Sequence, residues 1–220
     1  MPAIGNIKID VGRLIIVPVF AFLMILNILV VYQDLKALLP ISTIKATGLI
    51  HHLLMVCFYS LIIFLYFLRS QARSTSRSHI TNLLAIVATF IPFTLPFLGK
   101  PPLNKAETLL VANVIIIISI VLSIFTLGSL GKSFSIIPQA RKLIKTGPYK
   151  VVRHPLYVSE LIGVLGLVLA GLTIPKIAIF LLLVALQVYR AFQEENLLVN
   201  VFPEYKPYSS KTSRFIPGII

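Results

Sequence analysis

The fold is decided first by residues 14–32, whose sequence is LIIVPVFAFLMILNILVVY. This run carries no charged side chain, and its length is close to the ~20 apolar residues that a helix needs to cross the hydrocarbon core of a bilayer. The whole chain has the same character, because 57% of its 220 residues are hydrophobic and only 12% are charged. Its mean hydropathy of +0.95 is far above what a soluble domain needs for one core. We therefore expect an all-α integral membrane protein.

Further apolar runs predict about six transmembrane helices in total. The last two runs form a hairpin, with residues 171–175 as the tight turn between them. Pro92 and Pro96 lie in the third run and should kink it, because each proline removes a backbone hydrogen bond. The first run lacks a small-residue cleavage site and is not read as a removable signal. The six runs cover residues 14–32, 49–68, 80–98, 108–127, 157–172 and 174–195.

The distribution of basic residues predicts how the chain is oriented in the membrane. With six spans, 15 of the 20 Lys and Arg residues fall on the side that also holds both termini. The positive-inside rule then places the N-terminus, the C-terminus and the loop before residue 157 in the cytosol. The net charge of +13 comes with no nucleic-acid motif, so membrane lipids with anionic head groups are the expected partners. The single Cys57 excludes an internal disulfide and a cysteine metal cluster.

The chemistry of the sequence divides it into two parts. Residues 1–127 read as membrane-anchor spans, and residues 128–220 carry the unusual polar content. Between residues 128 and 157 apolar and basic residues alternate without forming a span, which predicts a cytosolic segment lying against the membrane interface. We expect this segment to be partly helical around residues 137–144.

The stretch GPYKVVRHPLY, at residues 147–157, is the first sign of a functional site. Arg153 and His154 lose too much hydration in a packed core unless a partner compensates them. Pro155 favours an extended conformation at His154 and can open the next helix at its first position. The imidazole and the free amides of that helix would then point at one spot, which suits an anion or a carboxylate.

A second polar group, RAFQEE, lies on the last predicted span at residues 190–195. Arg190 and Glu194 are four residues apart and share one helix face, while Glu195 lies about 100° round. An interfacial salt bridge with the arginine reaching water would explain the pair, but this Arg-then-Glu order stabilises a helix weakly, which favours a pocket. Tyr149 and Tyr157 suit an aromatic belt at the membrane surface as well as they suit packing against a ligand.

Other chemistries find no support in the sequence. His51, His52 and His79 have no Cys, Asp or Glu at metal-ligand spacing, so no metal is expected. The chain has no Gly-rich phosphate loop, no GxGxxG motif and no Ser/His/Asp set.

Taken together, these residues resemble the isoprenylcysteine carboxyl methyltransferase family and its bacterial relatives, which include phospholipid N-methyltransferases. The resemblance covers residues 128–220, and it implies a membrane enzyme that binds S-adenosylmethionine in a cytosol-facing pocket. It assigns Arg190 and Glu194 to the acceptor side as catalytic residues. At Ser159 the family commonly has glycine, which is a departure from its pattern. On the cofactor side the resemblance implies Tyr149, Arg153, His154, Pro155, Tyr157 and Glu195. It also rests on the tail residues Phe202, Tyr205, Tyr208, Arg214 and Pro217.

The expected reaction is methyl transfer to a lipidic or amphipathic acceptor. Transfer from a sulfonium is an in-line displacement that needs alignment more than proton transfer. Arg190 could hold a carboxylate acceptor, whereas an amine or thiol would need a base such as Glu194 or Glu195. Two alternatives remain open at this point. One is a membrane reductase of the sterol-reductase type with a nicotinamide cofactor, and the other is a lipid-binding membrane protein without catalysis.

Overall fold

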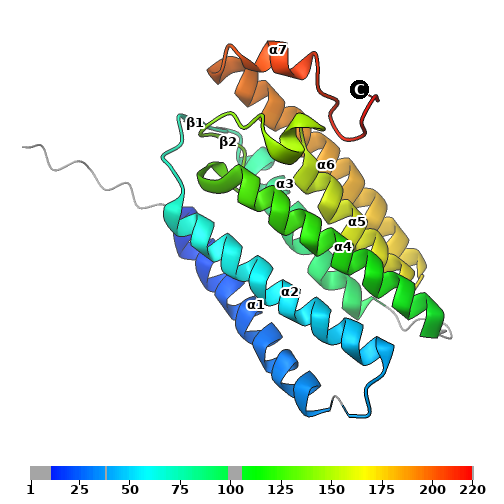
Figure 1. Cartoon of the computed structure of the whole chain (residues 1–220). Helices are drawn as coiled ribbons and strands as arrows, with labels where there is room; N and C mark the ends of the chain where they lie inside the picture. The colour runs from blue at the N-terminus through cyan, green and yellow to red at the C-terminus, as the bar shows by residue number, and fades with distance from the viewer. Residues whose placement is uncertain (1–10, 38, 99–105, 220) are drawn as a thin grey trace, which may run out of the picture.

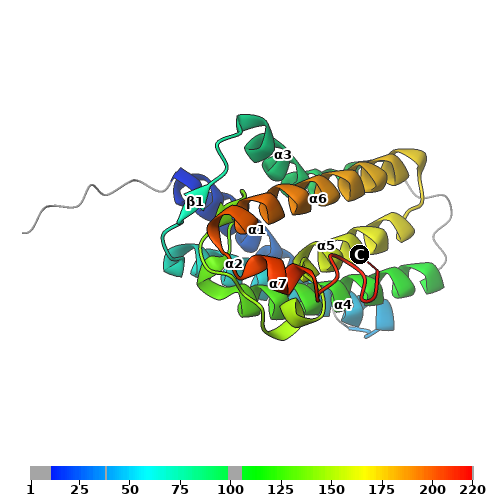
Figure 2. The same ribbon diagram turned by 90° about the horizontal axis from the view of Figure 1, so that it is seen from above.

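The computed structural model describes residues 11–37, 39–98 and 106–219. Its long helices run side by side with alternating direction, and the last helix and the C-terminal tail cover one end of the bundle (Figures 1 and 2). Within the described residues, two very short strands and two short 3₁₀ turns lie in the connections, and a third 3₁₀ segment continues α3. The helices are α1 (Val11–Lys36), α2 (Thr43–Leu68), α3 (His79–Phe90), α4 (Ala106–Leu130), α5 (Pro155–Leu169), α6 (Ile174–Val201) and α7 (Tyr205–Ser209). The short elements are β1 (Ser74–Thr75), η1 (Ile91–Phe97), η2 (Gly131–Ser133), β2 (Gln139–Ala140) and η3 (Gly147–Lys150).

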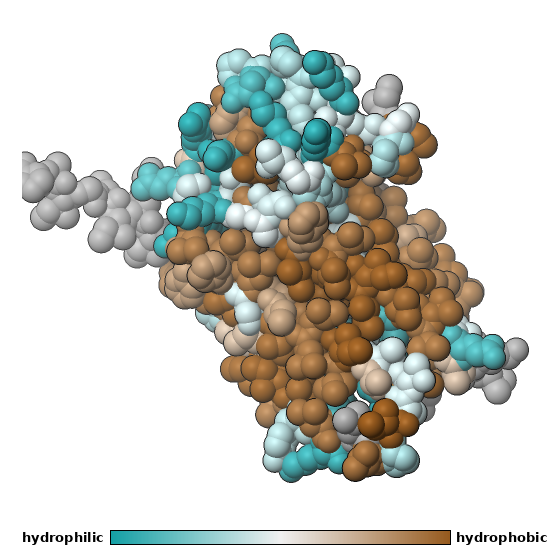
Figure 3. Space-filling view, in the orientation of Figure 1, coloured by the Kyte–Doolittle hydropathy of each residue, from teal (hydrophilic) through white to brown (hydrophobic). Residues whose placement is uncertain are grey.

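The all-α membrane fold is confirmed. Within the described residues, 5 helical segments are long and apolar enough to cross a bilayer: α1, α2, α3 with η1, α4, and α6. The expected fifth span is the 15-residue helix α5, which at ~1.5 Å per residue reaches only about 22 Å. That is shorter than the ~30 Å hydrocarbon core. Figure 3 shows the result as a broad apolar band between two polar ends.

The two breaks expected from proline and glycine are present. Helix α3 ends at Phe90 and continues as the 3₁₀ segment η1, with Pro92 near its start and Pro96 inside it. Each proline removes a backbone hydrogen-bond donor, which disfavours a regular α-helix through this segment. The tight turn of the hairpin lies between Leu169 and Ile174, as expected.

The helix expected around residues 137–144 is not formed. Instead, β2 pairs antiparallel with β1, and Ser74 lies opposite Ala140. The Arg73 amide donates to the Ala140 carbonyl at 2.7 Å, and the Ser76 amide donates to the Pro138 carbonyl at 3.0 Å. Pro138 has no N–H for a helix, and these partners on the loop between α2 and α3 satisfy the backbone in an extended form. The pairing ties the loop before α5 to the α2–α3 connection.

Helices α4 and α5 approach closely through small residues. A Cβ atom on Gly163 would lie 2.4 Å from Ser119 Oγ, so only glycine fits there without movement. Ser119 Oγ donates to the Ser159 carbonyl at 2.7 Å, and the Ser123 and Ser159 hydroxyls are 2.8 Å apart. Small and hydroxyl-bearing residues are typical of close helix contacts in membranes. Ser159 therefore packs on α4 and is fully enclosed there.

Apolar clusters on two sides of the bundle leave a space between them. One cluster joins α1, α2 and α4, and the other joins α3 and η1 to α5 and α6. Members of both clusters line the pocket described next. They include Phe20, Tyr59 and Ile62 on one side and Ala88, Val164 and Leu183 on the other.

Candidate active site

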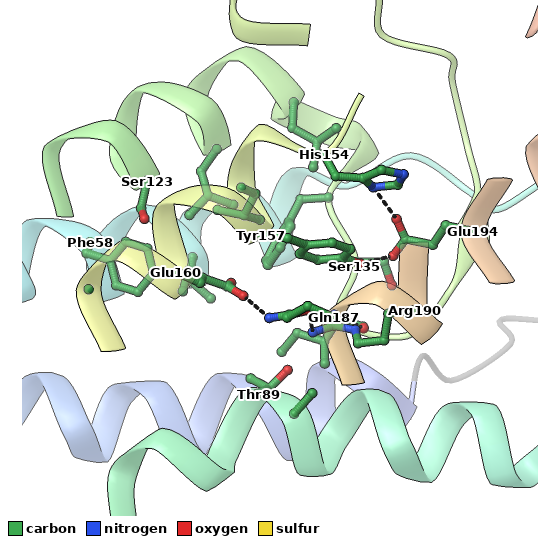
Figure 4. A pocket seen from close by; sticks show the side chains of 18 of the residues that line it. Phe58, Thr89, Ser123, Ser135, His154, Tyr157, Glu160, Gln187, Arg190 and Glu194 are labelled. Atoms are coloured by element: carbon green, nitrogen blue, oxygen red, sulfur yellow. Dashed lines mark hydrogen bonds and ion pairs between the residues drawn. The ribbon is translucent and has the colours of Figure 1, made fainter. Parts of the chain in front are cut away.

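A pocket of about 430 Å³ lies inside the bundle and combines a polar end with an apolar interior (Figure 4). The polar end is built by η3, the start of α5, the last turns of α6, and α7. The apolar part reaches between α1, α2, α3 with η1, and α4. Its lining includes Phe20, Met55, Phe58, Phe93, Pro96 and Ile120.

The structure brings most of the expected site residues to this pocket. Pro155 and Glu195 are not among its lining residues. Pro155 begins α5 directly after His154, which confirms its expected place at the first helical position. Glu195 contacts the C-terminal tail instead. The expected residues that do line the pocket are Tyr149, Arg153, His154, Tyr157, Arg190 and Glu194.

His154, Tyr157 and Glu194 form one connected group. The His154 and Tyr157 rings stack with centroids 5.3 Å apart and planes 6° apart. The Tyr157 hydroxyl donates a hydrogen bond to Glu194 Oε1, and His154 Nδ1 lies 3.9 Å from Glu194 Oε2. Side chains from the start of α5 and the end of α6 thus hold each other in place at the polar end.

Arg190 is buried at the boundary between the polar and apolar parts of the pocket. It is only 4% exposed, so it does not extend to water as an interfacial arginine would. Its Nη1 donates to Gln187 Oε1 at 3.1 Å, and its Nη2 donates to the Ile136 carbonyl at 3.0 Å. The guanidinium lies 4.7 Å from the centre of the Tyr157 ring. Its Nε makes no hydrogen bond within the described part of the chain.

Glu195 holds the C-terminal tail against the site. Arg214 donates from Nε and Nη2 to the two carboxylate oxygens, at 2.9 Å each. His154 Nε2 lies 3.0 Å and Arg153 Nε 3.2 Å from Glu195 Oε1. The hydrogen bonds to Glu195 raise the pKa of the Arg214 guanidinium. A two-point Arg–carboxylate contact is among the stronger polar interactions in proteins, so the tail is firmly attached here.

Backbone hydrogen bonds reinforce the same attachment. The Arg153 amide donates to the Ser213 carbonyl at 2.9 Å, and the His154 amide donates to the Arg214 carbonyl at 3.1 Å. Arg153 Nη1 donates to the Ser209 carbonyl at 2.7 Å. The tail therefore fixes the backbone that presents His154 to the pocket.

Buried phenols complete the polar end. The Tyr208 hydroxyl donates to the Tyr149 carbonyl at 2.5 Å, and burial raises the pKa of Tyr208 to about 12. Burial, and then the nearby Glu194, raises the pKa of Tyr149 well above its usual value. The Tyr205 hydroxyl is buried and finds no hydrogen-bond partner among the described residues. Tyr205 is also one of the residues that line the pocket.

A polar pair inside the pocket, Glu160 and Gln187, was not expected from the sequence. Gln187 Nε2 donates to Glu160 Oε2 at 2.6 Å, and Figure 4 shows both side chains in the middle of the pocket beside Arg190. A carboxylate five residues into an apolar helix is a signal that could have identified Glu160, since such residues are costly in membrane segments.

Residues 11–37, 39–98 and 106–219 contain no group of three His, Cys, Asp or Glu side chains placed to hold a metal ion. The His51 and His52 rings stack on each other 5.0 Å apart, and His52 Nδ1 lies 3.1 Å from Asn27 Oδ1. His51 reaches the far end of the pocket.

The fold and this pocket define the class of protein: a helical membrane protein whose buried pocket joins a polar end to an apolar interior. Residues 106–205 match the family model described as phospholipid methyltransferase. This family consists of membrane methyltransferases of the isoprenylcysteine carboxyl methyltransferase-like group, so the resemblance expected from the sequence is confirmed for these residues. The matched segment contains all eight expected site residues.

Two curated proteins are similar to part of this chain. The cobalt-zinc-cadmium resistance protein CzcN of Cupriavidus metallidurans is 34% identical over 108 residues, which cover 44% of this chain and 50% of that protein. The nickel-cobalt-cadmium resistance protein NccN of Alcaligenes xylosoxydans xylosoxydans is 37% identical over 82 residues, covering 37% of this chain and 38% of that protein. The chain thus spans half the length or less of these relatives. Their names describe metal resistance and say nothing of methyl transfer.

Proposed function

We propose that this protein transfers a methyl group from S-adenosylmethionine to a lipidic or amphipathic acceptor. The observation that carries the proposal is a single pocket in which Arg153, His154, Arg190 and Glu194, all within the family match, meet an apolar space between membrane helices. A water-soluble cofactor needs a polar site, and a membrane-borne acceptor needs an apolar one. Methyl transfer between them requires that the two sites adjoin.

The polar end suits the cofactor. Tyr149 and Tyr205 both line this end of the pocket, and the Tyr205 hydroxyl has no hydrogen-bond partner among the described residues. Arg190 and Glu194 would face the acceptor, as the family resemblance implies, and the hydrogen bond from Tyr157 holds Glu194 in place. When bound, the cofactor supplies the activated methyl group. The protein's own part is to align and enclose the reactants, which can account for most of the acceleration of such a displacement.

The remaining residues have supporting roles in this proposal. Pro155 starts α5 so that His154 faces the pocket, and Glu195 fixes Arg153, His154 and the tail behind the cofactor. Residues 128–220 would then form the methyltransferase core, and residues 1–127 would anchor it and line the space for the acceptor's apolar part.

The orientation follows from the basic residues. With the polar end of the pocket and both termini in the cytosol, the cofactor enters from water and the acceptor enters from the bilayer. The split of 15 against 5 Lys and Arg residues supports this arrangement.

The test is a binding titration of purified full-length protein. We expect S-adenosylmethionine and its demethylated product to bind, and reduced nicotinamide cofactors not to bind. We expect His154→Ala to weaken cofactor binding. Arg190→Ala should leave cofactor affinity within a few-fold but lower turnover by about a hundredfold, the scale of losing a positioning contact. Binding of a nicotinamide cofactor alone would instead support the sterol-reductase type of enzyme.

A further inference from the structure

Glu160 places a carboxylate in the interior of the bundle. It lies on α5, lines the pocket and is partly exposed to it. Among the described residues, no Lys, Arg or His nitrogen lies within ion-pair distance of it, and its hydrogen bond comes from the neutral amide of Gln187. A carboxylate in such a place is costly unless something compensates its charge, which points to a ligand group.

The side-chain amide of Gln187 bridges Glu160 and Arg190 by one hydrogen bond to each. Gln187 is 1% exposed, and it donates to Glu160 while accepting from Arg190 Nη1. An ionised carboxylate has about four acceptor positions, and Gln187 occupies one of them. The others remain for a donor that enters the pocket.

The charges around Glu160 favour a proton donor over an anion. Arg190 and Glu194 on α6 act on Glu160 electrostatically, and the phenols of Tyr149 and Tyr157 lie nearby. The facing parts of α4 and η1 contribute serine, proline and apolar side chains. An acceptor carboxylate would add a third negative charge beside Glu160 and Glu194, with Arg190 as their counter-charge, at a cost that a neutral or cationic head group avoids.

We propose that Glu160 binds the polar head of the acceptor and takes up its proton, so that the acceptor is an amphiphile with an N–H or S–H nucleophile. The inference rests on the proposed methyltransferase function. In the reaction, the proton of the nucleophilic atom moves to the Glu160 carboxylate. The freed lone pair then forms a bond to the methyl carbon as the carbon–sulfur bond of the sulfonium breaks, and the cofactor leaves as a neutral thioether. The protonated Glu160 returns its proton to water after the product leaves.

The experiment compares three probes with equal chains in the full-length protein: dodecylamine, dodecanethiol and laurate. Each is incubated with methyl-labelled S-adenosylmethionine over a range of pH. We expect label in at least one of the two protic probes and none in laurate. Glu160→Gln should lower that turnover at least about a hundredfold, the scale of losing a general base, and remove the fall in rate toward low pH.

A control and a binding measurement keep the outcomes distinct. Glu107→Gln removes an exposed carboxylate in the first turn of α4 and should turn over like the unchanged protein. Binding of S-adenosylhomocysteine reports folding, and Glu160→Gln should retain it within a few-fold. If the unchanged protein binds no cofactor, the methyltransferase proposal itself fails. If cofactor binds but label enters laurate, or none of the probes, or Glu160→Gln keeps its rate and pH profile, the role of Glu160 is overturned.

Discussion

Replacing Glu195 by glutamine should release the C-terminal tail from the polar end of the pocket. The change removes the negative charge that Arg214 binds with two hydrogen bonds and that Arg153 and His154 also contact. One hydrogen bond to a charged group contributes about 1.5–3 kcal/mol, and losing one partner of a buried ion pair costs about 3–5 kcal/mol. The Arg214 side chain is 19% exposed, so solvent screens part of this interaction. We therefore expect the attachment of the tail to weaken by about 2–4 kcal/mol.

Hydrogen exchange measures this release directly. The amides of Arg153 and His154 donate to carbonyls of the tail, and opening of the tail exposes them. A loss of 2–4 kcal/mol corresponds to exchange faster by about 30-fold or more, since every 1.4 kcal/mol is a factor of ten. The matched control is Glu194→Gln on the neighbouring residue, which is bonded to Tyr157 and not to the tail. Unchanged protection of the two amides in Glu195→Gln would refute the reasoning.

Three further changes test other parts of the structure. Single cysteines at Lys45 and at Lys142, in a chain whose own cysteine is replaced, should react with an impermeant thiol reagent from opposite sides of the membrane, and labelling from one side would contradict the proposed orientation. Gly163→Ala puts a Cβ atom 2.4 Å from Ser119 Oγ and should lower the free energy of unfolding by about 1–3 kcal/mol. Adding Ser119→Ala should recover part of this loss. A melting temperature equal to that of the unchanged protein would show that α4 and α5 separate easily. Tyr208→Phe removes the hydrogen bond to a backbone carbonyl of η3 and should cost about 1 kcal/mol in thermal unfolding, provided that the ring keeps its packing.

Much of the fold could be predicted because a membrane helix is specified locally. Each long apolar run satisfies its own backbone hydrogen bonds and needs no distant partner to do so. The expected runs therefore coincide with helices, and the breaks at Pro92 and Pro96 follow from the missing donors of proline. The prediction of a helix around residues 137–144 was wrong because the backbone there is not specified locally. Its hydrogen-bond partners lie on the loop between α2 and α3, far away in the sequence.

In the candidate site, too, local features could be predicted from the sequence, and contacts between distant segments could not. The motif at Arg153, His154 and Pro155 could be recognised in the sequence, and so could Arg190 and Glu194 on one helix face. Nothing in the sequence indicates that Glu195, one residue further on, contacts the tail at Arg214.

By itself, then, the sequence determined a membrane-embedded helical chain, its breaks, and the polar residues that suggest methyl transfer. Only the tertiary structure decided that helices α1 to α4 add an apolar space to those residues, and that Glu160, Gln187 and Arg190 meet inside it. The physical reason is that hydropathy and proline chemistry act along the chain. A pocket and the charges that face into it, by contrast, arise only when helices distant in sequence pack against each other.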